Sequence, residues 1–428
     1  MKYFLYFGGL ILCLAACQEA EDARPMSRNT FARFYESGES QEGVAALPFQ
    51  DGYILLASRV TPSDTTGLVI RTNSRGDVLW TTNLHGIIPR SLQTGQDAFF
   101  VFGDSIHVNP ESEVLDDLII HSALLYKIGF DGTPGGKLAI ADPAATNRID
   151  YRANAITLNE QNELILLGTF RSPGLTATER PFVAALGTTG FDTLWIKNYN
   201  IIDRDYVNAR SVHCTTDGYV IWASAILKEQ QSFERTYLSI PLVKENSVFE
   251  NSDVFGATTD QKLLAGDIQP AAITEFGYGV IGTYASPAGD NSNMFFGRIT
   301  SNGNFIAGSE RFFDGQHSSA NMPVTLLESA SQDTGDVLCA TSDGGYVLAG
   351  TMTTTPLRGN GGKDIFLVKV DAMGNIQWNR VMGGTGDETI SGIRETEDGG
   401  LLLCGSKDAS GLPAIFLIKT NPYGVIED

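Results

Sequence analysis

Short apolar runs recur along the chain, and each follows a turn-like segment that is often Asp-Gly or Gly-Gly. Such dipeptides accept positive φ angles and close tight hairpins. Each run therefore predicts a buried β-strand that is the second strand of a hairpin. The seven copies lie at residues 51–58, 96–104, 161–169, 217–224, 276–283, 344–351 and 399–406.

A second hairpin pattern follows these runs: a β-rich segment, a turn with glycine, and a segment that often ends in tryptophan. Each copy thus predicts four strands, A to D in chain order. The equivalent turn glycines are Gly76, Gly132, Gly190, Gly303, Gly374 and Gly424, and the fourth copy departs from the pattern at 244–246. Trp80, Trp195 and Trp378 share one register. We expect them to pack between neighbouring copies, because a buried indole contributes a large apolar area.

Seven units of this kind predict an all-β fold, a seven-bladed β-propeller of four-stranded antiparallel blades. Over residues 31–428 the repeat averages about 57 residues, longer than compact propeller repeats of about 40–50. A linear β-solenoid is the alternative, but its rungs are shorter and lack paired hairpins. The units are predicted to begin near residues 43, 91, 153, 208, 270, 336 and 390.

The two ends of the repeat region complement each other. The last copy stops after its third strand, at 424–428, whereas residues 29–37 precede the first copy and resemble the strand at 376–384 in spacing and apolar alternation. We therefore expect the N-terminal strand to complete the last blade and close the ring, which removes two exposed sheet edges.

The N-terminus has the features of a bacterial lipoprotein signal. Residues 3–16 are uncharged and apolar, follow Lys2 and end in Leu-Ala-Ala before Cys17. This predicts a signal peptide at 1–16, a lipidated Cys17 with an acidic tether at 17–28, and the propeller at 29–428. The acidic residues at 18–22 resemble the signal that directs Bacteroidetes lipoproteins to the outer face of the outer membrane.

Composition limits the partners. The formal net charge of −20 opposes binding to nucleic acid, and it restricts membrane contact to the lipid anchor. Cys214, Cys339 and Cys404 lie in strand-like runs without any Cys-x-x-Cys or Cys/His spacing, so we expect three buried thiols rather than a disulfide or metal site. The sequence predicts no cofactor.

The last two copies resemble a known repeat. Residues 383–424 contain Gly-Gly-x-Gly-Asp and Asp-Gly-Gly, and residues 343–384 contain Asp-Gly-Gly-Tyr followed by a Lys-Val-Asp-x-x-Gly-Asn run and Trp378. This pattern is similar to the β-propeller repeat of secreted Bacteroidetes proteins. The resemblance implies a propeller in an envelope protein, and it transfers no catalytic residue.

Long connections are predicted on one face of the ring. The A–B and C–D turns are short and share a face, while the B–C and D–A connections share the other. Binding residues concentrate in long loops on rigid scaffolds, so the sequence favours this B–C/D–A face around the central channel. Loop drift is the alternative, because insertions there cost little. The long connections lie at 107–117, 171–181, 227–235, 286–294, 312–323 and 354–364.

Candidate ligand-binding side chains on that face come from the loops at 107–117 and 354–364 and from the D–A connections. They are His107, Glu111, Asp116, Asp117, Asp205, Arg358, Asn360 and Asp387. The alternative interpretation is a solvated acidic loop, and aspartates that cap turns. No HExxH, GxSxG or phosphate-loop motif occurs, and the sequence predicts no catalytic or metal-binding residue.

These observations favour a surface-anchored, non-enzymatic module that binds a glycan, a peptide or an envelope protein. A propeller-based glycan hydrolase or lyase is the alternative, and it would need two carboxylates about 5–9.5 Å apart in the channel. A structural subunit of an outer-membrane complex is a third possibility.

Overall fold

The computed structural model describes sixteen stretches of the chain. Among these residues there is no helix with the length and apolar character that crossing a bilayer requires. The stretches are 29–61, 64–108, 119–140, 150–171, 179–199, 204–215, 218–227, 235–243, 253–255, 262–271, 277–285, 291–301, 303–315, 332–355, 358–408 and 411–427.

The described strands pair into separate four-stranded antiparallel sheets, written here from the ring centre outward. One sheet contains β2 (Ser40–Phe49), β3 (Gly52–Val60), β4 (Thr65–Asn73) and β5 (Val78–His85). The next contains β6 (Ile88–Thr94), β7 (Ala98–Val108), β8 (Ile119–Gly129) and β9 (Pro134–Ala139). It is followed by β10 (Asp150–Leu158), β11 (Glu163–Arg171), β12 (Glu179–Gly187) and β13 (Thr193–Asn198).

The second half of the chain continues this pattern. One sheet contains β14 (Arg204–Cys214), β15 (Gly218–Leu227), β16 (Arg235–Val243) and β17 (Asp253–Phe255). Another contains β18 (Lys262–Pro270), β19 (Tyr278–Ala285), β20 (Ser292–Ile299) and β21 (Arg311–Phe313). A further sheet contains β22 (Val337–Ala340), β23 (Tyr346–Thr355), β24 (Arg358–Val370) and β25 (Ile376–Met382). The remaining sheet contains β26 (Asp387–Glu395), β27 (Leu401–Asp408), β28 (Ala414–Lys419) and β1 (Phe31–Tyr35).

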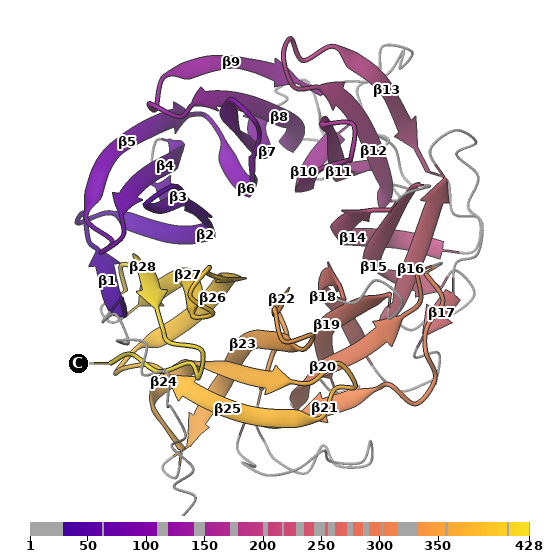
Figure 1. The fold of residues 1–428 in the computed structure, drawn as a ribbon. Helices are drawn as coiled ribbons and strands as arrows, with labels where there is room; N and C mark the ends of the chain where they lie inside the picture. Colours follow the sequence, from indigo (N-terminus) through magenta and orange to yellow (C-terminus); the bar gives the residue numbers. More distant parts are fainter. Residues whose placement is uncertain are drawn as a thin grey trace, which may run out of the picture.

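The sheets stand in a circle, so the predicted all-β propeller with four-stranded antiparallel blades is confirmed (Figure 1). The expected role of the N-terminal strand is confirmed as well. β1 pairs antiparallel with β28, with Phe31 opposite Lys419 and Tyr35 opposite Ile415. Thr30 reinforces this pairing, since its hydroxyl donates to the Glu427 carbonyl at 3.0 Å and accepts from the Glu427 amide at 2.8 Å.

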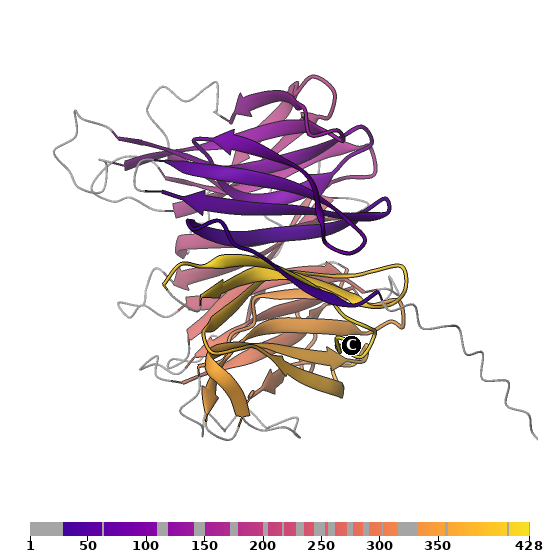
Figure 2. The ribbon, with the colours of Figure 1, turned by 90° about the vertical axis from the view of Figure 1, so that its left-hand side faces the viewer.

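The hydrophobic core lies between neighbouring blades. Along β3, Ile54 and Leu56 pack against the β6–β9 sheet, while Tyr53 and Leu55 pack against the sheet of β26–β28 and β1. Both faces of the strand are buried, which explains why the sequence shows continuous apolar runs rather than alternation. The side view shows the blades stacked on one another around the ring (Figure 2).

The C–D turns pack on the outer strand of the preceding blade. Gly132 has a φ of +87°, and a side chain there would contact Trp80 of β5. Gly424, with a φ of +69°, lies against Trp378 of β25 in the same way. Trp80, Trp195 and Trp378 all pack against buried inter-blade clusters, which confirms the prediction for these residues.

Two predicted boundaries differ from the structure. The segment 354–364 is not an irregular loop, because β23 and β24 extend to Thr355 and Arg358 and pair there, leaving residues 356–357 between them. The fifth unit begins at Lys262 rather than near 270, where its first strand ends. In the fifth unit, the register shift between Ala265 and Ile268 interrupts the alternation of the first strand.

The thiols behave largely as expected. Cys214, Cys339 and Cys404 form no disulfide among the described residues, and Cys339 and Cys404 are buried while Cys214 is half-buried. Burial raises the pKa of Cys339 and of Cys404 to about 12. Both are therefore neutral, unreactive core residues at physiological pH.

Candidate functional site: the central channel

A cavity of about 860 Å³ occupies the centre of the ring. Its walls come from the inner strands β2, β6, β10, β14, β18 and β26 and from the start of β22. Asp104 and Thr169 on second strands and Glu179 at the start of β12 also line it. The volume lies within the range of small-ligand sites.

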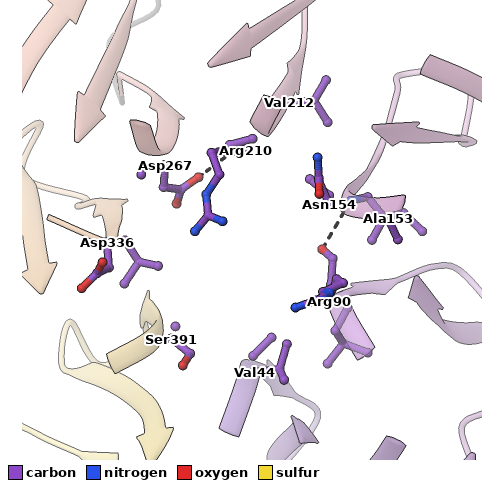
Figure 3. A pocket seen from close by; sticks show the side chains of 18 of the residues that line it. Val44, Arg90, Ala153, Asn154, Arg210, Val212, Asp267, Asp336 and Ser391 are labelled. Carbon is purple, nitrogen blue, oxygen red and sulfur yellow. Dashed lines mark hydrogen bonds between the residues drawn. The ribbon is translucent and has the colours of Figure 1, made fainter. Parts of the chain in front are cut away.

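β-bulges aim side chains toward the cavity from the inner strands other than β22. The pairing register shifts across Val44 in β2, Arg90 in β6, Asn154 in β10, Arg210 in β14 and Ser391 in β26. In β18 the shift covers Gly266 and Asp267, and Asp336 lies directly before β22. A bulge re-aims a side chain and interrupts strand pairing, and bulges recur beside functional sites. Figure 3 shows these residues around the cavity.

The preceding blade holds the backbone just before several of these bulges. The Gly43 amide donates to Ser406 Oγ at 3.1 Å, and the Gly335 amide donates to Thr283 Oγ1 at 3.1 Å. The Ala153 amide donates to Asp104 in the equivalent way. Val44, Asn154 and Asp336 therefore each follow a residue whose amide is bound by a polar group of the neighbouring sheet.

Asp104 is an exception within the repeat. The equivalent positions in the other blades carry buried hydroxyl residues, namely Ser58, Thr169, Ser224, Thr283, Thr351 and Ser406. Asp104 is 1% exposed and its Oδ2 accepts from Arg90 Nε at 2.9 Å. Burial raises the pKa of Asp104, although the Ala153 amide and Arg90 oppose this shift. The pair fixes the Arg90 side chain at the cavity wall.

A polar cluster borders the cavity where the β6–β9 and β10–β13 sheets meet. Arg152 lies 3.4 Å from Asp150 and 3.3 Å from Glu179, and the His121 amide donates to Asp150 at 2.8 Å. Burial lowers the pKa of His121. The imidazole is therefore neutral at physiological pH, and the charges of the cluster are those of Arg152 and its carboxylate partners.

Charge is unevenly distributed around the bulge residues. Arg90, Asn154 and Arg210 are contributed by consecutive blades, and Asp267 and Asp336 by the two blades that follow. Figure 3 shows Arg210 reaching into the cavity between Asn154 and Asp267. Asp267 accepts from Ser211 Oγ at 2.6 Å, from the Ile268 amide at 2.8 Å and from Gln269 Nε2 at 3.2 Å.

Asp336 is half-buried and accepts a hydrogen bond from Thr334 Oγ1 at 2.6 Å. Burial raises the pKa of Asp336, while the Thr334 hydroxyl and Arg210 oppose the shift. Within the described part of the chain, no group of three or more His, Cys, Asp or Glu side chains is arranged to hold a metal ion.

The sequence-predicted loop residues lie elsewhere or outside the described residues. His107 is exposed near the end of β7, with its Nε2 2.9 Å from Ser105 Oγ. Cys17, Glu111, Asp116 and Asp117 lie outside the residues that the structure describes. Asp205 is the second residue of β14, opposite Ile226, and Arg358 begins β24 opposite Thr355.

Asn360 and Asp387 come together at the junction of β24 and β26, not in the channel. The Asn360 amide donates to Asp364 at 2.8 Å, and its side chain donates to the Gly383 carbonyl at 3.2 Å. Asp387 accepts from the Lys363 amide at 2.9 Å. The Asp387 contact joins neighbouring blades, and a ligand-binding role for Asn360 and Asp387 stays a prediction.

Sequence reasoning missed the channel residues. Arg90, Asn154, Arg210, Asp267 and Asp336 occur in the first strand of each copy, where a polar residue interrupts the apolar pattern. Aligning the copies at that interruption, rather than at the loops, would have singled them out. The interruption is visible in the sequence, but its residue type varies among the copies, from Val44 and Ser391 to arginine, asparagine and aspartate in the others.

Comparison with known proteins bears on the fold alone. No protein-family model and no curated protein sequence matches the chain. A Dyadobacter fermentans protein of unknown function covers 91% of this chain and 98% of its own, at 10% identity and a TM-score of 0.47. The match to a Penicillium chrysogenum α-L-arabinanase complexed with arabinobiose covers 79% of this chain and 94% of the arabinanase, at 9% identity and a TM-score of 0.48. The match to a Trypanosoma rangeli sialidase in complex with the inhibitor DANA covers 89% of this chain and 55% of the sialidase, at 8% identity and a TM-score of 0.46.

Proposed function

We propose that this protein is a lipoprotein, anchored through Cys17 to the outer face of an outer membrane, whose seven-bladed ring binds a polar ligand in its central channel. The observation that carries the proposal is the cavity of about 860 Å³, into which bulges in the inner strands aim polar and charged side chains. The ring serves as a non-enzymatic binding module in this proposal.

Seven blades are supported by the strand pairing. The described residues form seven four-stranded sheets, and β1 supplies the outermost strand of the sheet that contains β26, β27 and β28. Core clusters connect β3 with both of its neighbouring sheets. The first and last parts of the repeat region therefore share one blade, as a closed ring requires.

The position of β1 supports an outward-facing ligand site. Phe31 lies opposite Lys419, directly before the C–D turn at 420–424, whereas Tyr35 lies opposite Ile415, near the B–C connection. The tether therefore joins the ring on the face that carries the C–D turns. A tether of residues 17–28 reaches at most about 40 Å. In this proposal the B–C/D–A face is turned away from the membrane.

A hydrolase or lyase is the second candidate function. It is supported by Asp104 and Asp336, which both line the cavity and whose pKa values are raised by burial. A carboxyl group with a raised pKa is what a general acid requires. Asp104 is, however, committed to Arg90 and to the Ala153 amide, so we favour binding over catalysis.

A channel-filling substitution tests the binding proposal. Val44→Trp adds volume at a cavity position without changing charge. Residues 18–428 are screened on a glycan array and in pull-downs from envelope extracts, as wild type and as V44W. We expect V44W to lose the ligands of the wild type. Leu79→Trp is the matched control, because Leu79 is 58% exposed on the outer strand β5.

Each outcome of this screen decides between the candidates. Ligands retained by a folded V44W variant would contradict a channel site. Chemical conversion of a bound glycan by the wild type, lost in an Asp336→Asn variant, would favour the hydrolase instead. A stable envelope protein captured equally by the wild type and V44W would identify a structural subunit.

A further inference from the structure

We infer that the channel ligand carries a carboxylate on a polyhydroxylated body, a ligand of the uronic-acid class, and that Arg210 and Arg90 bind this carboxylate. The inference deepens the proposed function, and it rests on the channel being the ligand site. It is carried by the positions of the two arginines and by the difference between the donor and acceptor sides of the cavity.

Arg210 is the centre of the inferred site. It occupies the bulge of β14, and its side chain is exposed although it lies inside the ring. Its guanidinium makes no hydrogen bond and no ion pair at salt-bridge distance with the residues that the structure describes. Five N–H donors in a fixed fork match the two oxygens of a carboxylate.

Arg90 adds a second set of donors from the bulge of β6. Its Nε donates to Asp104 Oδ2 at 2.9 Å, so the two terminal nitrogens remain available toward the cavity. Asp104 is buried and also accepts from the Ala153 amide, which makes it a fixed support. The Arg90 side chain is 46% exposed, and Figure 3 shows it directed toward the centre of the cavity.

Both carboxylates on the acidic side of the cavity already accept hydrogen bonds from protein donors. Asp267 accepts three hydrogen bonds, from Ser211, Gln269 and the Ile268 amide. Asp336 accepts from Thr334. An ammonium group on the ligand would compete with these internal bonds. An anion would instead meet the Arg210 guanidinium and the two terminal nitrogens of Arg90, which are available as donors. The cavity therefore favours an anion over a zwitterion.

The remaining polar lining suits hydroxyl groups. Asn154 uses both hydrogens of its amide, toward Thr169 and the Ala209 carbonyl, which leaves its oxygen as an acceptor. Ser391 and Asp336 can accept or exchange hydrogen bonds with further hydroxyls. An acidic sugar combines these features, and the volume of about 860 Å³ holds a short oligosaccharide.

The acidic surface of the protein does not oppose this site. The formal net charge is −20, but exposed charges are screened beyond about 8 Å at physiological ionic strength. Inside the channel the two arginines act at contact distance, where screening is weak. The channel should therefore prefer anionic ligands small enough to reach Arg90 and Arg210.

The test is calorimetric titration of residues 18–428 with tetragalacturonate and with its fully methyl-esterified form. The ester keeps the rings and loses the charges. We expect the acid to bind at least about 10-fold more tightly than the ester, and Arg210→Gln and Arg90→Gln each to weaken the acid by about 10- to 100-fold. Arg75→Gln, which removes an exposed arginine from a C–D turn, is the charge-matched control and should bind as the wild type does.

Three results would overturn the inference. Equal binding of acid and ester would exclude carboxylate recognition. Wild-type affinity in a folded R210Q variant would exclude the assigned centre. Tighter binding of inorganic sulfate or of tetraglutamate than of the sugar acid would exclude the uronic-acid class. The V44W variant distinguishes the two proposals in each case. If V44W loses binding, the channel is still the ligand site, even when the inference about the carboxylate fails.

Discussion

Lys419 Nζ lies 3.0 Å from an oxygen of Asp398, although 21 positions separate the two residues in the chain. The same pairing of a third-strand cation with an A–B turn aspartate recurs between Lys369 and Asp343 at 2.9 Å. Two further blades repeat it, through Lys127–Asp97 at 3.0 Å and Arg71–Asp51 at 2.9 Å. A basic residue of the third strand and an aspartate of the A–B turn therefore form a structural contact within each of these blades.

Lys419→Met should destabilise the protein. Lys419 is 2% exposed and also donates to the Thr420 carbonyl at 2.8 Å. Because Asp398 remains partly solvated in the variant, we expect a loss of about 1–2 kcal/mol in the free energy of unfolding. Urea unfolding at pH 7 measures it. Lys137→Met, at an exposed position on β9, is the control. An equal loss of unfolding free energy in that variant would contradict a stabilising role of the Lys419–Asp398 pair.

The pH dependence of this pair follows from Asp398. Burial raises the pKa of Asp398, but hydrogen bonds from Thr396 and Lys419 outweigh it and the net pKa is lowered. A lowered carboxyl pKa contributes stability above the unfolded-state pKa, and this is lost as the pH falls through the folded-state value. The difference between wild type and K419M should therefore shrink in acid, below about pH 4. A constant difference from pH 7 to pH 3 would contradict this.

Asp364→Asn should stabilise the protein at neutral pH. Asp364 is fully buried, and Asp364 Oδ1 and Glu388 Oε1 have no hydrogen-bond donor among the described residues. Glu388 Oε1 does lie 3.1 Å from Lys407 Nζ, an ion pair without hydrogen-bond geometry. Burial raises the pKa of Asp364, and the neighbouring Glu388 carboxylate adds to this shift. We expect D364N to gain about 1–2 kcal/mol at pH 8, because the amide is neutral and can donate.

The sign of the pH dependence is opposite to that of Asp398. A raised carboxyl pKa contributes stability below the unfolded-state pKa, and that contribution is lost as the pH rises through the folded-state value. The advantage of D364N should thus be largest at pH 8 and decline toward pH 4. Asp387→Asn, an exposed neighbour, serves as the control. A gain independent of pH would show that the carboxyl of Asp364 is not the cause.

Removal of β1 should open the ring. A chain that begins at residue 38 lacks the strand whose Phe31 and Tyr35 pack on the cluster around Tyr53 and Leu402. We expect a loss of about 3 kcal/mol or more relative to a chain that begins at residue 29, since two aromatic side chains lose their burial. Added peptide 29–37 should restore part of the lost stability by strand addition. Equal melting temperatures of the two chains would contradict the closing role.

The orientation of the anchored ring can be measured at the two ends of β28. Tyr423 is 63% exposed in the C–D turn, and Leu412 is 51% exposed beside the B–C connection. Y423C and L412C are labelled with a fluorophore in the lipidated protein on liposomes that contain nitroxide lipids. We expect stronger quenching at position 423, because the tether joins the ring on that side. Equal quenching, or stronger quenching at 412, would reverse the proposed orientation, and the unlipidated C17S protein provides the baseline.

Much of the fold could be predicted from local patterns. The apolar runs, the turn glycines such as Gly132 and Gly424, and the strand-like residues 29–37 are short-range features. They identify hairpins because turn conformation and strand alternation depend on residues close together in the chain. The pairing of β1 with β28 also followed, since a unit missing one strand has an edge that a spare strand can cover.

The candidate site could not be predicted in the same way. Arg90, Arg210 and Asp336 belong to different blades, and a bulge in the inner strand decides whether Arg90 and Arg210 face the cavity or the neighbouring sheet. The sequence favoured residues of long connections, yet Asn360 bonds to Gly383 after β25 of its own blade, and Asp387 joins two neighbouring blades. The chain by itself determined the repeated hairpins and how the ring closes, because these depend on local geometry. Tertiary structure alone decided which side chains meet at the centre of the ring. These side chains come from separate strands around one axis, so no fixed spacing in the sequence identifies them.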